Sequence, residues 1–142
     1  MDELTRLLSD LVAIDSVNPD LVPGAKGEGE IARYVADWMR RAGLEVTVED
    51  TGMPGRPNVI GVARGTGGSR SLLLNAHMDT VGVAGMTAPF APEIRDGRLY
   101  GRGALDTKAA LAAFMAATAG AASGRGAPSC AIPLRSRGTS RS

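Results

Sequence analysis

The chain has 142 residues, a formal net charge of +1 and 44% hydrophobic residues. This length suits one domain, and a charge so close to zero gives no overall field that would attract nucleic acid or a membrane surface. The single cysteine, Cys130, excludes an internal disulfide framework, and the N-terminus lacks the basic and apolar regions of a signal peptide. We therefore expect a cytoplasmic protein.

Two amphipathic helices are predicted first, over residues 3–14 and 28–42, with Asp2 as the N-cap of the first and Gly43 after the end of the second. Alternating polar and apolar residues predict a half-exposed strand over 44–49, and a second strand is expected over 58–63. A third is expected over 71–76, where three consecutive leucines indicate burial on both faces.

An Asp-Gly turn predicts a hairpin over residues 94–100, and an alanine-rich helix is expected over 107–118. Two helices, then strands, then a helix indicate an α/β layered domain.

The segment after residue 119 has a different composition. No acidic residue follows Asp106, and residues 120–142 are mostly Gly, Ala, Ser, Pro and Arg, with no aromatic residue. This composition is typical of a disordered basic tail. It would also result from out-of-frame translation of a G+C-rich gene, which is the interpretation that we favour. We therefore separate residues 1–119 from a low-complexity tail over residues 120–142.

The chemistry of the sequence lies between residues 72 and 108. His77 and Asp79 follow the leucine strand, and residues two apart on a strand point to the same face. The carboxylate can fix the tautomer and orientation of a metal-binding imidazole. An incidental aspartate beside a surface or core histidine is the simpler explanation of this short motif, but His77 is the only histidine of the chain.

The second motif is the glycine-rich stretch Gly101–Lys108, in which Asp106 is the only carboxylate. Taken alone, Asp106 could be merely the cap of the helix that follows. The two motifs together predict a carboxylate-bridged metal pair, which would activate a water molecule and polarise a carbonyl.

Residues 76–81 (AHMDTV) and 101–108 (GRGALDTK) resemble the two N-terminal signatures of a zinc metallopeptidase family. Its members include acetylornithine deacetylase, succinyl-diaminopimelate desuccinylase, aminoacylase and glutamate carboxypeptidase. The resemblance runs from the first helix to about residue 119. It implies that residues 1–119 are the N-terminal portion of an α/β catalytic domain with three layers, helix/sheet/helix, around a mixed sheet.

The resemblance also implies the roles of the site residues. His77 would bind one zinc ion, Asp79 would be the catalytic-site carboxylate that orients His77, and Asp106 would bridge two zinc ions, for which cobalt or manganese could substitute. The peptide bond after Asp106 would be cis. The substrate would be a small N-acyl amino acid or peptide whose amide bond is hydrolysed.

The family's general-base glutamate, its remaining ligands and its lid and dimerisation domain have no counterpart in this sequence. A catalytic zinc ion usually has about three protein ligands, and a general base contributes ~10²–10⁴ in rate. We therefore expect this polypeptide alone to bind zinc weakly and to be inactive. We also expect Leu72, Leu73 and Leu74 to lie at an open sheet edge and to promote aggregation.

Two other functions remain open. The chain could be a non-catalytic module that folds on a partner or forms a homodimer through its open sheet edge, although family members are often homodimers through a domain absent here. It could also bind nucleic acid through its basic tail, but four arginines and no stacking aromatic make this the weaker alternative.

Overall fold

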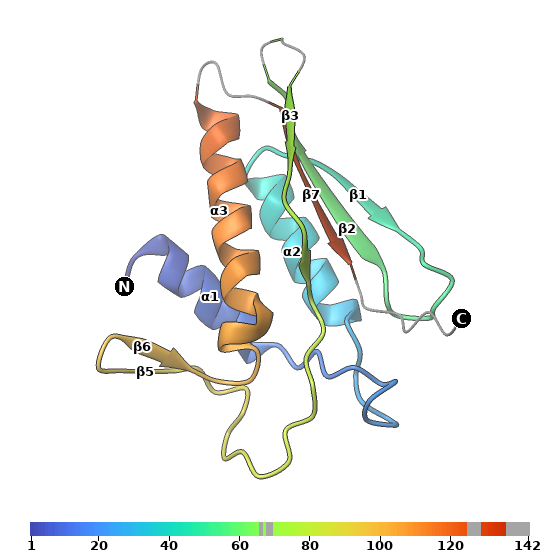
Figure 1. The fold of residues 1–142 in the computed structure, drawn as a ribbon, viewed down its shortest axis with the longest axis vertical. Coiled ribbons are helices and arrows are strands. Elements are labelled where there is room, and N and C mark those ends of the chain that lie inside the picture. Colours follow the sequence, from blue (N-terminus) through green and yellow to red (C-terminus); the bar gives the residue numbers. More distant parts are fainter. Residues whose placement is uncertain (66, 68–69, 125–128, 136–142) are drawn as a thin grey trace.

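The computed structural model describes residues 1–65, 67, 70–124 and 129–135 (Figure 1). Within these residues it contains three helices, α1 (Glu3–Ala13), α2 (Gly29–Arg41) and α3 (Ala109–Ser123). The strands are β1 (Glu45–Glu49), β2 (Asn58–Ala63), β3 (Ser71–Leu73), β4 (Ala76–His77), β5 (Glu93–Arg95), β6 (Arg98–Tyr100) and β7 (Ser129–Arg135). A π-helical turn, Ala104–Lys108, leads into α3.

The main sheet is mixed, with strand order β1-β2-β7-β3, and β4 also pairs with β7. β2 runs antiparallel to both β1 and β7, with Val48 opposite Val59 and Ile60 opposite Pro133. β3 and β4 run parallel to β7, with Leu73 opposite Ala131. β5 and β6 form a separate antiparallel hairpin.

The helix ends follow from local chemistry. The Asp2 carboxylate accepts a hydrogen bond of 2.8 Å from the backbone N–H of Thr5 and caps α1. After α2 the chain turns at Gly43, whose φ of +83° belongs to the left-handed region that glycine adopts most readily. Both helices bury one apolar stripe, which includes Leu7 and Leu11 on α1 and Val35 on α2.

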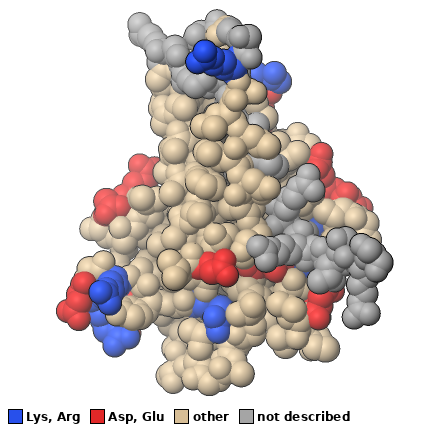
Figure 2. All heavy atoms as spheres, viewed as in Figure 1, with Lys and Arg blue, Asp and Glu red and all other residues tan. Residues whose placement is uncertain are grey.

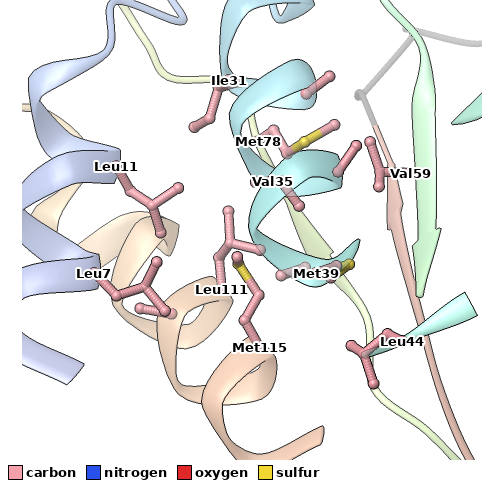
Figure 3. Packing of buried hydrophobic residues seen from close by; sticks show 14 of the residues in the cluster. Leu7, Leu11, Ile31, Val35, Met39, Leu44, Val59, Met78, Leu111 and Met115 are labelled. Carbon is pink, nitrogen blue, oxygen red and sulfur yellow. The ribbon is translucent and has the colours of Figure 1, made fainter. Parts of the chain in front are cut away.

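Helices α2 and α3 pack against one face of the main sheet, and α1 packs against α3 on the side away from the sheet (Figures 1 and 3). Val59 and Ala63 of β2 point to this face and are buried. A Cβ added at Gly61 would lie 2.5 Å from Met39 Sδ, so a larger residue here would force the Met39 side chain of α2 to move. Figure 3 shows the resulting core, which includes Leu7, Leu11, Ile31, Val35, Met39, Leu44, Val59, Met78, Leu111 and Met115.

The predicted α/β class is confirmed. Among the residues that the structure describes, the helices occupy one side of the sheet, so the chain supplies two of the three expected layers. β2 has the predicted bounds, α1, α2 and β1 lie within one residue of theirs, and the predicted hairpin forms around Asp96 and Gly97. α3 begins at Ala109 and continues to Ser123, so it starts and ends later than expected.

The prediction for the leucine strand was wrong in part. The strand divides into β3 and β4, and the Leu72 and Leu73 side chains are 51% and 64% exposed. Burial on both faces would need a layer on each side of the sheet, and the described helices cover only one. Exposure at a sheet edge was the second expectation for these leucines, and it is confirmed for Leu72 and Leu73, whereas Leu74 packs against the core.

Part of the segment predicted as a tail also differs from expectation. Ser129–Arg135 forms β7, which lies between β2 and β3 in the sheet. The short apolar run Cys130–Leu134 supplies this strand. The Gly, Ser, Pro and Arg residues on both sides of this run dominate the composition, and the prediction of a tail depended on that composition. Residues 125–128 and 136–142 lie outside the described residues, and the tail boundary and the frame-shift interpretation stay predictions.

Across the described part of the chain, no helix has the length and apolar character required to cross a membrane. On the face that Figure 2 shows, the atoms over the centre are mostly uncharged. The sequence of α3 accounts for this, because Ala109–Ser123 contains no charged residue.

Candidate metal site

The candidate site lies where β4 and the π-helical turn meet. β4 pairs in parallel with β7 and ends at His77, so the chain leaves the sheet edge with Met78 buried and Asp79 next. The β5–β6 hairpin returns the chain through Gly101 and Gly103 to the turn that carries Asp106. Two segments about 30 residues apart in sequence therefore meet at one end of the sheet.

The two nitrogens of the His77 imidazole face different carboxylates. Nδ1 lies 3.0 Å from Asp79 Oδ1 and 3.1 Å from the Asp79 carbonyl oxygen. Nε2 lies 3.2 Å from Asp106 Oδ1. The side chains of His77 and Asp79 are 17% and 7% exposed, whereas that of Asp106 is 86% exposed. The structure thus brings together all three residues predicted from the sequence.

These contacts shift the pKa values of the buried pair in opposite directions. The hydrogen bond with Asp79 raises the pKa of His77 above its ordinary value, against the opposing effect of burial. Burial alone would raise the pKa of Asp79, but hydrogen bonds from His77 and Asn18 outweigh it and hold that pKa below its ordinary value. Asp79 is therefore a carboxylate at neutral pH.

Asp106 does not cap the helix that follows it. The N-cap of α3 is Lys108, with no side-chain cap hydrogen bond, and the Asp106 side chain instead faces His77 Nε2. The simpler explanation of Asp106 as a cap is therefore wrong. The peptide bond between Asp106 and Thr107 is cis, as the resemblance implied.

Lys108 lies on the same π-helical turn as Asp106 and is a buried residue to which the sequence reasoning assigned no role. Its side chain is almost fully enclosed, and its Nζ donates a 2.7 Å hydrogen bond to the carbonyl oxygen of Ile14, the residue after α1. Burial lowers the pKa of Lys108 to about 8, against the attraction of Asp15. A Cβ added at Gly103 would lie 3.1 Å from Lys108 Cδ, so the glycine makes room for this side chain.

Asn18 is the second residue that the sequence reasoning missed. It was interpreted only as part of a loop before Pro19, but its side-chain Nδ2 donates a 2.8 Å hydrogen bond to Asp79 Oδ2. The two residues are 61 positions apart and both are buried. The only local signal would have been a polar residue next to a turn, which does not distinguish a turn from a site residue.

A pocket of about 380 Å³ opens over these residues. Its lining includes both carboxylates and the imidazole of the site, together with apolar side chains of Leu21, Val81 and Leu105. Arg102 also lines it. A concave space with a few polar groups and apolar walls is typical of a small-molecule site.

The donor atoms here suit a metal ion. An imidazole nitrogen and a carboxylate oxygen are ordinary ligands of zinc, and the opposite ring nitrogen of His77 is held by a carboxylate, as is usual for a metal-binding histidine. Among the described residues, no group of three or more His, Cys, Asp or Glu side chains is arranged to hold a metal ion. The described residues therefore offer the types of ligand that suit zinc, but fewer of them than a zinc ion usually has.

Comparison with known proteins gives a family from the sequence and a shared fold from the structure. Residues 73–130 match the model of peptidase family M20/M25/M40. A succinyl-diaminopimelate desuccinylase of Paraburkholderia xenovorans is 35% identical over 120-odd residues, a match that covers 83% of this chain and 30% of the relative. The chain spans about 27–30% of the length of the curated relatives that it matches.

Two solved structures share the fold. Human carnosine dipeptidase 1 is similar with a TM-score of 0.76 and 22% identity, over 94% of this chain and 31% of that one. A dinuclear metal binding peptidase from the M20 family of Bacillus subtilis is similar with a TM-score of 0.58 and 17% identity, over 92% of this chain and 33% of that one. The chain thus has the α/β fold that these structures share over about a third of their length. Through residues 73–130 it belongs to peptidase family M20/M25/M40.

Proposed function

We propose that this chain supplies His77, Asp79 and Asp106 to a two-metal site that hydrolyses amide bonds of N-acyl amino acids or small peptides. The observation that carries the proposal is the double contact of His77, with one ring nitrogen on Asp79 and the other facing Asp106. The pocket above these residues supports it, since it leaves room for a small substrate. The metallopeptidase family and the desuccinylase relative support the substrate class.

Each residue has a distinct role in this proposal. Asp79 accepts the Nδ1 proton of His77 and so leaves the Nε2 lone pair free to bind one metal ion. Asp106, exposed on the facing turn, would supply its carboxylate oxygens to the metal pair. When bound, the ions polarise the amide carbonyl and lower the pKa of a water molecule. Leu21, Val81 and Leu105 line the pocket and offer apolar surface to the side chain or acyl group of the substrate.

The metals that we propose are two zinc ions, with cobalt or manganese as alternatives, because imidazole and carboxylate ligands suit several divalent ions. The dinuclear metal binding relative of Bacillus subtilis supports the use of a metal pair. The single cysteine supports a cytoplasmic location.

We also propose that the 142-residue chain binds zinc weakly and does not turn over by itself. Two metal ligands are fewer than a zinc ion usually takes, and the described residues contain no larger ligand group. A general base near the water, which contributes ~10²–10⁴ in rate, is also lacking among the carboxylates of the pocket, since both are already engaged with His77.

Calorimetric titration of the chain with zinc and with cobalt tests the weak metal binding, and a hydrolysis assay tests the absence of turnover. We expect weak binding that disappears in His77→Ala, and no hydrolysis of N-succinyl or N-acetyl amino acids above background. Asn75→Asp is a matched control, because Asn75 is exposed and lies two residues before His77. Submicromolar zinc affinity or turnover would contradict the proposal for the isolated chain, and binding that survives in His77→Ala would contradict the assigned ligand.

One observation favours a second function, a module that self-associates through its sheet edge. β3 is the last strand of the sheet order, and Leu72 and Leu73 on it are mostly exposed. Exposed apolar edge strands pair readily with other chains. Light scattering would separate the two functions: a mass that doubles with concentration and falls back in Leu73→Lys supports self-association, and a constant monomer mass excludes it.

A further inference from the structure

Asn18 reaches the candidate site from the connection between α1 and α2. Its side chain is 3% exposed, and its Nδ2 donates to Asp79 Oδ2 at 2.8 Å. The same carboxylate contacts His77 through its other oxygen. The Nδ1 hydrogen bond itself is to the carbonyl oxygen of Asp79, at 3.1 Å. A buried amide, a buried carboxylate and the imidazole therefore lie in one series of polar contacts, in which Asp79 is the middle member and contacts Nδ1 through both its backbone and its side chain.

The orientation of the Asn18 amide is fixed by its two partners. Its Oδ1 accepts a 2.8 Å hydrogen bond from the backbone N–H of Asp20, so its NH₂ group must face Asp79. Rotating the amide by half a turn would set the NH₂ group against a donor and the carbonyl oxygen against a carboxylate.

The backbone holds Asn18 beside Asp79 as well. The Asn18 N–H donates to the Thr80 carbonyl oxygen at 2.9 Å, and the Thr80 N–H donates to the Ser16 carbonyl oxygen at 2.9 Å. Val17 and Thr80 form a parallel bridge. These bonds tie the segment after α1 to the segment after β4, so the amide cannot move away from Asp79 unless this bridge breaks.

Neutral His77 can carry its proton on Nδ1 or on Nε2, and a carboxylate lies beside each of these nitrogens. A proton on Nδ1 is shared with the buried Asp79, whereas a proton on Nε2 is shared with the exposed Asp106. Only the first tautomer leaves Nε2 free for a metal ion. A carboxylate that is buried and held in place accepts a stronger hydrogen bond than an exposed one, so the fixed position of Asp79 favours this tautomer.

We propose that Asn18 is a positioning residue for the metal site, which acts through Asp79 to keep the proton of His77 on Nδ1 and Nε2 free. The inference rests on the proposed role of His77 as a metal ligand. It adds to that role a third residue, from a loop that neither of the two sequence motifs includes.

Nuclear magnetic resonance tests the inference without a metal, because the chain has a single histidine and its two ring nitrogens give unambiguous long-range ¹H–¹⁵N correlations. At a pH where the imidazole is neutral, we expect the wild-type chain to carry its proton mainly on Nδ1. In Asn18→Leu, which has a similar size but no donor, we expect a shift of population toward the Nε2-protonated tautomer. Asn75→Asp controls for added charge near the histidine and should match the wild type.

Asn18→Asp separates the positioning role from a role in the turn. It keeps an oxygen for the Asp20 N–H but sets a carboxylate against Asp79. Circular dichroism and thermal melting establish that each variant is folded. We expect Asn18→Asp to lose the Nδ1 preference although the turn is kept. Folded Asn18→Asp and Asn18→Leu variants with the wild-type tautomer would overturn the inference.

Cobalt titration provides the second measurement. Loss of a residue that orients a metal ligand typically costs about 10–100-fold in metal affinity, and we expect a loss in this range for both variants relative to Asn75→Asp. A wild-type chain that binds no cobalt through His77 contradicts the proposed function and leaves the tautomer result standing. Cobalt affinity that is equal in wild type and variants contradicts the role of Asn18.

Discussion

Two clusters of buried charge in this molecule are built differently. In the first, Arg56 and Glu28 are both almost fully enclosed and share a two-pronged contact, with guanidinium–carboxylate distances of 2.8–3.1 Å. The Arg56 guanidinium also contacts Asp20 at 2.6 Å. These carboxylates raise the pKa of Arg56 above its ordinary value. Every charge in this cluster has an opposite charge beside it.

The second cluster consists of the candidate site and Lys108, which lies on the same turn as Asp106, and its charges are less fully compensated. The Lys108 amine is enclosed but contacts a neutral carbonyl oxygen, and burial lowers its pKa to about 8. Asp106 remains exposed. A fully paired buried charge stabilises one structure, whereas perturbed and partly paired groups in a pocket are typical of sites that take up a ligand. The difference between the clusters separates a structural ion pair from a candidate site.

The largest expected effect is a loss of stability when the buried partner of Arg56 is removed. In Glu28→Leu the Arg56 guanidinium keeps Asp20 but loses its buried partner, and we expect the free energy of unfolding to fall by about 3–5 kcal/mol. Urea unfolding measures this. The matched control is Glu45→Leu, which removes the exposed Arg64–Glu45 pair and should cost much less, because solvent screens exposed charges. Equal losses in the two variants would mean that burial does not set the strength of the Arg56 cluster.

The next effect concerns Lys108 and depends on pH. Its folded-state pKa of about 8 lies below the ordinary value of 10.5, so between these values the unfolded chain binds more protons than the folded one. Stability should therefore rise with pH in this window, by up to ~3 kcal/mol, because the cost of burying the charged amine is relieved. In Lys108→Met this rise should be absent.

Unfolding of both proteins between about pH 8 and pH 9.5 measures the difference. At higher pH the ionisation of Tyr34 also affects stability, because burial and its hydrogen bond with Asp10 raise the pKa of Tyr34 to about 12. That shift stabilises the fold below the ordinary value of 10 and is lost above it. Parallel curves for wild type and Lys108→Met would show that Lys108 is not the perturbed group.

The sequence predicted the parts of this molecule that local patterns determine. Helical spacing of apolar residues located α1 and α2, the alternation of polar and apolar residues over 44–49 located β1, and the Asp-Gly turn located the hairpin. The meeting of His77 with Asp106 was also predicted, because each lies at the end of a recognisable motif.

The missed features depend on contacts between distant segments. Lys108 meets Ile14 across 94 residues and Asn18 meets Asp79 across 61, and no local pattern distinguishes either residue from an ordinary surface lysine or turn asparagine. β7 was missed for a related reason, since its short apolar run gains its ladder only from strands that lie far earlier in the chain.

The smallest effect on stability, and the sharpest contrast with Glu28, is expected for Asp106→Asn. Because the Asp106 side chain is 86% exposed, the free energy of unfolding should change by no more than about 0.5 kcal/mol. The pKa of His77, followed by its proton resonances, should nevertheless fall toward its ordinary value, since the hydrogen bond with Asp106 is one cause of its rise. Asp79→Asn should lower this pKa further, because the contact with Asp79 is the larger cause. A large loss of stability in Asp106→Asn would mean that this carboxylate stabilises the fold, as Glu28 does. A lowered pKa of His77 in an equally stable protein would mean that Asp106 belongs to the site.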